Sequence, residues 1–89
     1  MLEIVRTSQF KRDVKKALRR NKNPEKLKTL IRLLVRGKTL SDKYQDHPLR
    51  GDYKSCRDSH IEPDWILIYR ISGNELHLIR TGTHADLFR

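Results

Sequence analysis

The pattern of apolar and polar residues divides the first half of the chain into one strand and two helices. Residues 2–6 alternate between apolar and polar side chains and include β-branched residues, so they predict a short first strand. Residues 8–21 and 24–36 carry apolar side chains at spacings of three and four, which is typical of amphipathic helices. Asn23 and Gly37 favour the start and the end of the second helix. Because few residues connect the helices, they are expected to pack as an antiparallel pair.

The second half of the chain predicts a sheet. Residues 38–51 lack a sustained period and are expected to form a loop, whereas residues 53–60 could form a strand. Residues 65–71 are apolar on both faces, which favours a central strand, and residues 75–81 follow a tight turn as its hairpin partner. Residues 82–89 are expected to be a short tail. This order predicts an α+β fold: an N-terminal strand and an antiparallel helix pair precede a three-stranded antiparallel meander, with the helices on one face of the sheet and the other face free for a site.

Length and composition narrow the class of protein. The 89 residues are expected to form a single domain, residues 1–89. Hydrophobic residues make up 36% and charged residues 35%, so the core is small and the surface strongly ionic. The single cysteine, Cys56, excludes an internal disulfide and a thiolate zinc cage. No apolar run is long enough for a membrane span and no signal peptide opens the chain, so the sequence predicts a cytoplasmic protein without a membrane partner.

The net charge of +9 is unevenly distributed. Residues 1–38 contain thirteen Lys or Arg and three acidic residues, whereas residues 39–89 contain seven and eight. This asymmetry favours a polyanionic partner, most simply a nucleic acid, with a lipid surface or an acidic protein as alternatives. A basic helix face can also be merely solvated. The cations expected to contact an RNA or ribosome backbone lie on the first predicted helix: Lys11, Lys15, Lys16, Arg19 and Arg20.

The four histidines, all in the second half, are the main candidates for chemistry. His47, His60 and His84 lie in segments that the predicted topology brings to one concave surface, together with Asp64. An unperturbed histidine titrates near pH 6.5, so it can accept and donate protons at neutral pH, and a neighbouring carboxylate can orient it. His77 alternates within a predicted strand and is expected to be structural. The pattern therefore predicts a general acid–base site.

Two other kinds of site could use these residues, and the spacing favours neither. Two or three histidines with an aspartate could hold zinc or iron, but no His-x-x-x-His pair or compact facial spacing occurs. Ser55 and Ser59 lack the glycine pattern of a nucleophile elbow. We therefore expect neither a metal nor another cofactor.

A basic surface beside a metal-free acid–base site favours RNA cleavage. The 2′-hydroxyl of RNA can attack the adjacent phosphate once a base removes its proton, while an acid protonates the departing 5′-oxygen. DNA lacks this hydroxyl and would not be cut by the same groups. The residues thus predict a ribonuclease.

Three segments resemble the YafQ branch of the RelE/ParE toxin superfamily: residues 46–51 (DHPLRG), 57–69 (RDSHIEPDWILIY) and 80–88 (RTGTHADLF). Length and motif order agree as well, so the resemblance covers essentially the whole chain. It implies a RelE-like fold and a type II toxin that inhibits translation as an mRNA interferase, a ribosome-dependent endoribonuclease cutting mRNA in the A site of the 70S ribosome. It also implies a cognate DinJ-like antitoxin, whose complex with the toxin would bind operator DNA chiefly through the antitoxin.

The resemblance also implies roles for individual residues. The functional positions of the family fall on His47, Asp58, His60, Asp64, His84 and Phe88, with Trp65 beside them. His84 is expected to be the general acid, and His60 or His47, oriented by Asp64, the base. Phe88 is expected to stack on a nucleotide base. Arg57 or Arg80 could neutralise the scissile phosphate.

Two other classes of function stay open from the sequence. The ParE branch of the same superfamily inhibits DNA gyrase by binding it, without a nuclease site. The histidines argue against this class, because a binding protein has no need of proton-transfer groups. A non-catalytic RNA-binding or ribosome-binding module is the other alternative, and it would leave translated message uncut.

Overall fold

The computed structural model describes residues 1–88, which form five strands, three helices and two short 3₁₀ turns. The strands are β1 (Glu3–Arg6), β2 (His47–Pro48), β3 (Arg57–Glu62), β4 (Trp65–Ser72) and β5 (Glu75–Gly82). The helices are α1 (Ser8–Arg19), α2 (Pro24–Val35) and α3 (His84–Phe88), and the 3₁₀ turns are η1 (Asp42–Tyr44) and η2 (Gly51–Tyr53). The predicted α+β class is confirmed.

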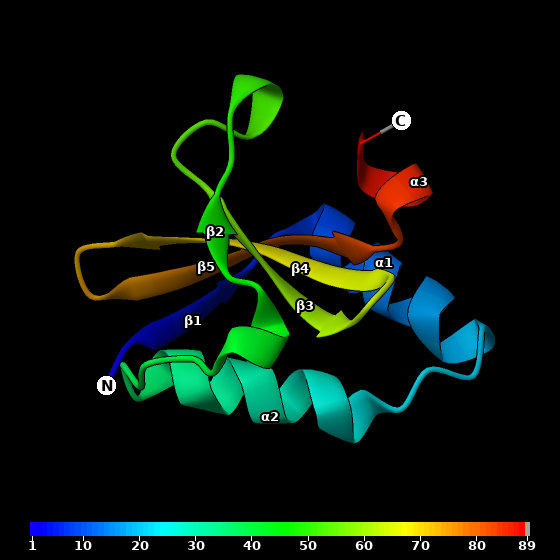
Figure 1. Ribbon diagram of the computed structural model, residues 1–89, viewed down its shortest axis with the longest axis horizontal. Coiled ribbons are helices and arrows are strands. Elements are labelled where there is room, and N and C mark those ends of the chain that lie inside the picture. The colour runs from blue at the N-terminus through cyan, green and yellow to red at the C-terminus, as the bar shows by residue number, and fades with distance from the viewer. Residues whose placement is uncertain (89) are drawn as a thin grey trace.

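All five strands belong to one mixed sheet with the order β1-β5-β4-β3-β2 (Figure 1). Strands β3, β4 and β5 pair antiparallel in sequence order, whereas β1 pairs parallel with β5. Strand β2 pairs antiparallel with β3 over two residues only, with His47 opposite Asp58. The sheet therefore places the first strand at one edge and the short strand with His47 at the other.

Local signals set the ends of the two long helices. Thr7 Oγ1 accepts a hydrogen bond from the Phe10 N–H at 2.9 Å before α1, and Asn23 Oδ1 accepts one from the Glu25 N–H at 2.9 Å at the start of α2. Gly37, with a φ of 67°, follows α2 in the left-handed conformation that favours glycine. The signals of Asn23 and Gly37 thus act at the positions where they were expected, and Thr7 caps α1 in the same way.

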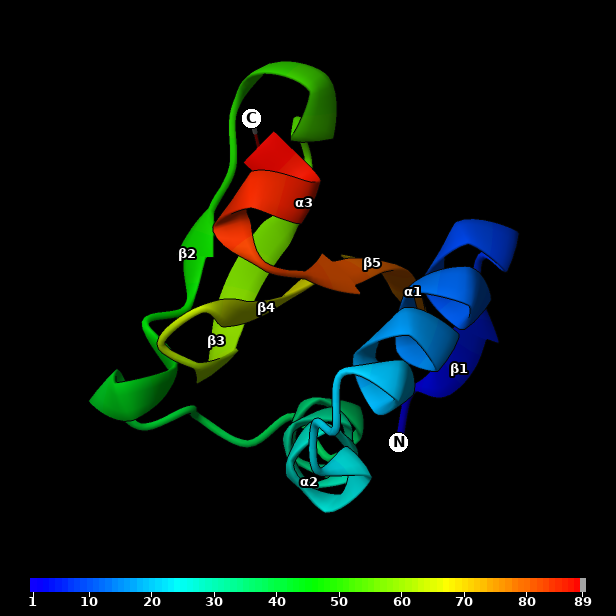
Figure 2. The same cartoon turned by 90° about the vertical axis from the view of Figure 1, so that its right-hand side faces the viewer.

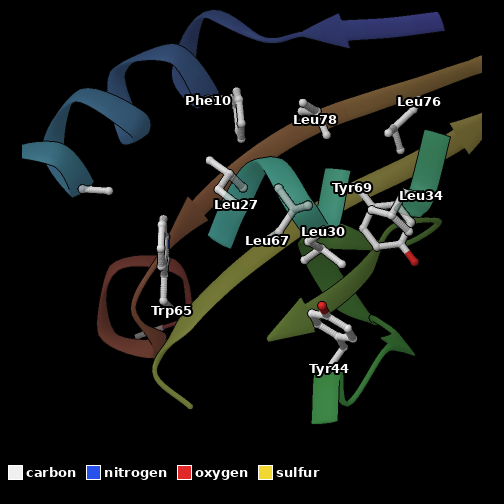
Figure 3. Close-up of a cluster of buried hydrophobic side chains, with 11 residues drawn as sticks. Phe10, Leu27, Leu30, Leu34, Tyr44, Trp65, Leu67, Tyr69, Leu76 and Leu78 are labelled. Carbon is white, nitrogen blue, oxygen red and sulfur yellow. The ribbon is translucent and has the colours of Figure 1, made fainter. Parts of the chain in front are cut away.

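The larger hydrophobic core lies between the sheet and the helices α1 and α2 (Figure 3). On β4 its members are alternate residues, Trp65, Leu67 and Tyr69, which point to the same face of the sheet. The buried residues of this core are Phe10, Ala17, Leu27, Leu30, Leu34, Tyr44, Trp65, Leu67, Tyr69, Leu76 and Leu78.

A second, smaller core covers the opposite face of the sheet. Ile66 and Ile68 of β4 pack there with Leu87 of α3 and with Cys56. Figures 1 and 2 show α3 and the segment that carries η2 on the side of the sheet away from α2. The predicted helix pair lies on one face of the sheet, but the prediction that the other face is free was wrong. Because β4 is apolar on both faces, each face needs a cover.

Three segments differ from their predicted structure. Strand β3 begins at Arg57 rather than at residue 53, because residues 51–53 form η2 and Ser55 has a φ of 73°. The loop over residues 38–51 contains η1 and β2. The expected tail contains α3, whose apolar Leu87 is buried. No helix within residues 1–88 is long and apolar enough to cross a membrane.

Candidate active site

Three histidines from separate parts of the chain gather on the sheet face that α3 covers. Asp58 and His60 of β3 lie opposite Ile68 and Ile66 of β4, the residues of the second core, so they point to that face. His47 is carried by β2, and His84 is the first residue of α3. The charges of the three histidines all act on the Asp58 carboxyl, which is 2% exposed. His47, His60 and His84 thus lie near Asp58, and their roles stay a prediction.

A row of aromatic rings runs from β3 along α3 to the η2 turn. The ring centres of His60 and His84 lie 5.9 Å apart, and those of His84 and Phe88 lie 5.4 Å apart. Tyr53 of η2 meets Phe88 edge to face, with ring centres 6.0 Å apart. Phe88 is 37% exposed, which leaves part of its ring open to a stacking partner.

His47 is oriented by two oxygen atoms. Its Nδ1 lies 2.8 Å from the Gln45 carbonyl oxygen and 2.9 Å from Asp58 Oδ1. Because a carbonyl oxygen can only accept, the Gln45 contact assigns a proton to His47 Nδ1, and Asp58 Oδ1 lies at ion-pair distance from the same nitrogen. Burial raises the pKa of the Asp58 carboxyl, and the positive charges of His47, His60 and His84 oppose this rise. With Nδ1 occupied, Nε2 is the nitrogen of His47 that can meet a substrate.

Asp64 contacts His84 rather than His47 or His60. Its Oδ1 accepts the His84 backbone N–H at 2.9 Å and lies 3.7 Å from His84 Nδ1. His60 instead places Nδ1 3.2 Å from the Pro63 carbonyl oxygen. The expectation that Asp64 orients the base therefore does not match these contacts: Asp58 takes that position beside His47, and Asp64 holds the start of α3.

The two candidate phosphate-binding arginines are both paired with carboxylates. Arg57 Nε donates to Asp46 Oδ1 at 2.7 Å. Arg80 donates from Nε and Nη2 to the two oxygens of Asp13, at 3.0 Å each. Trp65 is 2% exposed and belongs to the core on the α1 and α2 side, away from the three histidines. Neither arginine is a free cation, and Trp65 does not line the histidine cluster.

The cations of α1 divide into two groups. Arg20, next to the helix, donates to Asp86 at 2.7 Å, and Lys16 lies 3.3 Å from the same carboxylate. Asp86 also accepts the Thr83 N–H at 3.0 Å. These contacts tie α1 to the start of α3 and hold the pKa of Asp86 well below its usual range, chiefly through the Arg20 hydrogen bond. The exposed cations of α1 without an ion pair among residues 1–88 include Lys11, Lys15 and Arg19.

A half-buried carboxylate behind the site, which the sequence did not mark as a functional residue, anchors the loop before His47. Asp46 accepts hydrogen bonds from Ser59 Oγ, the Tyr69 hydroxyl and Arg57. Burial by itself would raise the pKa of Asp46, but the hydrogen bonds from Ser59, Tyr69 and Arg57 outweigh it and lower the pKa below 3.8. Asp46 therefore joins the loop to β3 and β4. In the sequence, the only sign of this role was that Asp46 is a polar residue next to His47.

Asp46 is expected to make the stability of the protein depend on pH. A carboxyl whose pKa is lowered in the folded state stabilises the fold above its unfolded pKa, and this stabilisation is lost as the pH falls through the lower, folded value. Asp46→Asn should therefore lower the free energy of unfolding by about 1–2 kcal/mol at pH 7, and by progressively less below about pH 4. Urea unfolding of both proteins from pH 2 to pH 7 measures this, and a constant difference would contradict it.

The described residues do not form an evident metal site. Among residues 1–88, no group of three or more His, Cys, Asp or Glu side chains is arranged to hold a metal ion. The contacts of His47 and His60 with carbonyl oxygens involve their Nδ1 atoms and leave Nε2 of each ring open.

Comparisons with known proteins identify relatives of high similarity. The mRNA interferase toxin YafQ of Escherichia coli K12 is 48% identical over 87 residues, which cover 97% of this chain and 95% of the relative. The toxin in a crystal structure of the Escherichia coli DinJ–YafQ complex is 47% identical, with a TM-score of 0.93 and full coverage of both chains. A metal-bound toxin from Helicobacter pylori is 36% identical, with a TM-score of 0.92, and covers 99% of this chain and all of that one.

The family comparison agrees with the fold and the histidine cluster. Residues 2–89 match the model described as the bacterial toxin of a type II toxin-antitoxin system, YafQ. The match includes β1 at one edge of the sheet and the site residues of β2, β3 and α3. The chain therefore belongs to the YafQ family of bacterial type II toxins.

Proposed function

We propose that residues 1–89 are a single toxin domain and that it is an mRNA interferase, which cleaves mRNA in the A site of the 70S ribosome. The observation that carries this proposal is the arrangement of His47, His60 and His84 around the buried carboxylate of Asp58. The exposed ring of Phe88 beside His84 adds a surface for a base. The activity named for the Escherichia coli relative supports the same reaction.

The proposed reaction uses the 2′-hydroxyl of the RNA as the nucleophile. A histidine base takes the proton of this hydroxyl, and its oxygen forms a bond to the adjacent phosphorus atom. The bond from phosphorus to the 5′-oxygen breaks, and His84 donates a proton to that oxygen. The products are a 2′,3′-cyclic phosphate and a 5′-hydroxyl, and the two histidines have exchanged protonation states.

The contacts of the two candidate bases favour His47. Its Nδ1 proton is directed to Gln45, so neutral His47 has a free lone pair on Nε2. Asp58, 2.9 Å away, stabilises the positive charge that His47 acquires when it takes a proton. His60 has only a carbonyl oxygen at its Nδ1 and lies beside His84, so it is better placed to contact the phosphate. Its proton would then stabilise the developing negative charge.

Partners of this chain follow from the same proposal. A DinJ-like antitoxin would hold the toxin inactive, as the complex of the Escherichia coli relative suggests. An acidic surface of this antitoxin would be attracted to the chain, whose net charge is +9. Operator DNA would be bound through the antitoxin in the complex. The ribosome would orient the mRNA at an open site that holds few substrate contacts of its own, which is a proximity effect.

Translation of a defined message in vitro tests the proposed function. The protein should produce new 5′ ends in phase with the codons, and only while the message is being translated. Uncut message with inhibited translation would instead favour a ribosome-binding module. Uncut message with inhibited supercoiling by DNA gyrase would favour a ParE-like toxin.

Binding of RNA should depend on salt through the exposed cations of α1. Each phosphate contact lowers the slope of log K against log salt by about 0.7 for a single strand. Lys11, Lys15 and Arg19 have no ion pair among the described residues, so the variant in which all three are alanine should flatten the slope by about 2. Filter binding of a single-stranded RNA at several salt concentrations measures the slope, and an unchanged slope would exclude this surface from RNA binding.

A further inference from the structure

A groove of about 410 Å³ is lined in part by His60 of the histidine cluster and extends away from that cluster. It is bounded by η1, by one side of α2 and by the turn between β3 and β4. Figure 2 shows η1 and α2 on either side of that turn. Its volume lies in the range of binding sites for small ligands, about 300–1,000 Å³, and is large enough for one nucleotide. The polar and aromatic residues that line it include Lys26, Thr29, Lys43, Tyr44, Gln45 and His60.

We propose that this groove is a subsite for the nucleotide next to the scissile phosphate, and that the side chain of Gln45 selects its base. The inference rests on the proposed function, because His60 belongs both to the groove and to the histidine cluster. His60 is shared by the groove and the histidine cluster, so RNA that contacts both His84 and His60 would reach the groove at this residue. The groove thus adds sequence selection to a site whose other groups act on the sugar and the phosphate.

Gln45 connects the groove to the catalytic histidines. Its backbone oxygen accepts the hydrogen bond from His47 Nδ1 at 2.8 Å. Its φ of 45° is in the left-handed region, which is uncommon for a residue other than glycine and is found where the surrounding structure enforces it. Its side chain is exposed, and its amide makes no hydrogen bond within residues 1–88. The amide offers a donor and an acceptor side by side, the pattern that reads the edge of a base.

The charges at the groove suit a nucleotide with its phosphate. Lys26 is neutralised by Glu62, at 2.9 Å, so it contributes little free charge. Lys43 has no carboxylate partner within residues 1–88, and its Nζ lies 5.0 Å from the centre of the Tyr44 ring. The ammonium group of Lys43 is therefore available for a phosphate, and the Gln45 amide is available for a base.

The variant Gln45→Asn tests the base selection. Asparagine tolerates the left-handed conformation well and keeps the amide, but the amide is withdrawn by one methylene. When 5′ ends from translated messages are mapped at all sites, the preference for the favoured base beside the cut should fall about fivefold or more. The readout is the distribution of 5′ ends and not the total rate of cleavage, because the Gln45 carbonyl also holds His47. The same distribution of 5′ ends as the wild type would overturn the proposal.

Two lysine variants, one inside and one outside the groove, test whether Lys43 binds a phosphate. Lys43→Ala should weaken cleavage at all sites alike. It should also flatten the slope of log K against log salt for RNA binding by about 0.7, the value for one phosphate contact. Lys28→Ala removes an exposed lysine of α2 that lies outside the groove and pairs with Glu25 at 3.3 Å, and it should change neither measurement. Equal effects of the two variants would overturn the role of Lys43.

A binding measurement separates this inference from the proposed function. A short RNA with 2′-O-methyl groups cannot be cleaved, and its titration should shift the side-chain amide resonances of Gln45 in the NMR spectrum of the wild-type protein. No shift of Gln45 at saturating RNA would overturn the subsite even if cleavage is observed. A shift of Gln45 together with an uncut translated message would support the subsite and contradict the nuclease function. A groove that takes an extended peptide instead would also leave Gln45 unshifted by RNA.

Discussion

Replacement of His84 with alanine is expected to lower the rate of mRNA cleavage by about 10²–10⁴-fold, the usual contribution of a general acid. His84 lies at the start of α3, and the centre of its ring is 5.9 Å from that of His60 and 5.4 Å from that of Phe88. Its loss therefore removes the proton donor from within the row of aromatic rings. RNA and ribosome binding should persist, because the cations of α1 are unaffected. Single-turnover cleavage of translated message and a separate binding assay measure the two effects.

His77→Ala is the control for the loss of His84. His77 lies on β5 opposite Arg70 and contacts Glu75 at 3.1 Å, away from the cluster around Asp58. Its replacement should leave the cleavage rate within about a factor of two, because His77 lies outside the histidine cluster. His84→Gln keeps a polar side chain and should be as inactive as His84→Ala. Full activity of either His84 variant would remove this residue from the mechanism.

Replacement of Asp13 with alanine is expected to lower the free energy of unfolding by about 3 kcal/mol, the lower end of the range for breaking a buried ion pair. Asp13 is 6% exposed and accepts bonds from Arg80, from the Thr81 N–H at 3.1 Å and from Gln9 at 3.0 Å. Burial alone would raise the pKa of Asp13, but these bonds lower it. The Arg80 side chain remains 25% exposed, so water compensates part of its loss.

Urea unfolding measures the effect of Asp13→Ala. Its midpoint should fall strongly, because about 3 kcal/mol is a large fraction of the stability of a small domain. Asp52→Ala, at an exposed position of η2, should change the stability by no more than about 0.5 kcal/mol. A loss below about 1 kcal/mol for Asp13→Ala would mean that the pair with Arg80 contributes little to the junction of α1 and β5.

The elements that depend on local signals were predictable, and those that depend on distant contacts were not. The helices after Thr7 and Asn23 follow from apolar spacing and capping residues, and both caps are present. Helix α3 has five residues and is too short to be stable by itself. Its stability comes from Leu87 in the second core and from the bond between Asp86 and Arg20, which are 66 positions apart.

The candidate site also combines residues that the sequence identifies with contacts that only the fold decides. Its histidines could be identified from the sequence because the residue type itself carries the chemistry. The partner of each charged group could not, because pairing depends on geometry across the fold. Arg80 was expected at the phosphate and is bound to Asp13, and Asp64 was expected at the base and holds His84. Tyr53 and Gln45 belong to loops without a period, so no pattern marked them.

The sequence by itself therefore determined the α+β class, the helices α1 and α2, the central position of β4 and the identity of the histidines. These properties are encoded in residue type, spacing and capping, which act over a few neighbouring positions. Only the tertiary structure decided that His47, His60 and His84 surround Asp58, that α3 covers the second face of the sheet, and which carboxylates neutralise the arginines. These contacts join residues far apart in the chain, and the folded sheet brings them within a few ångströms of one another.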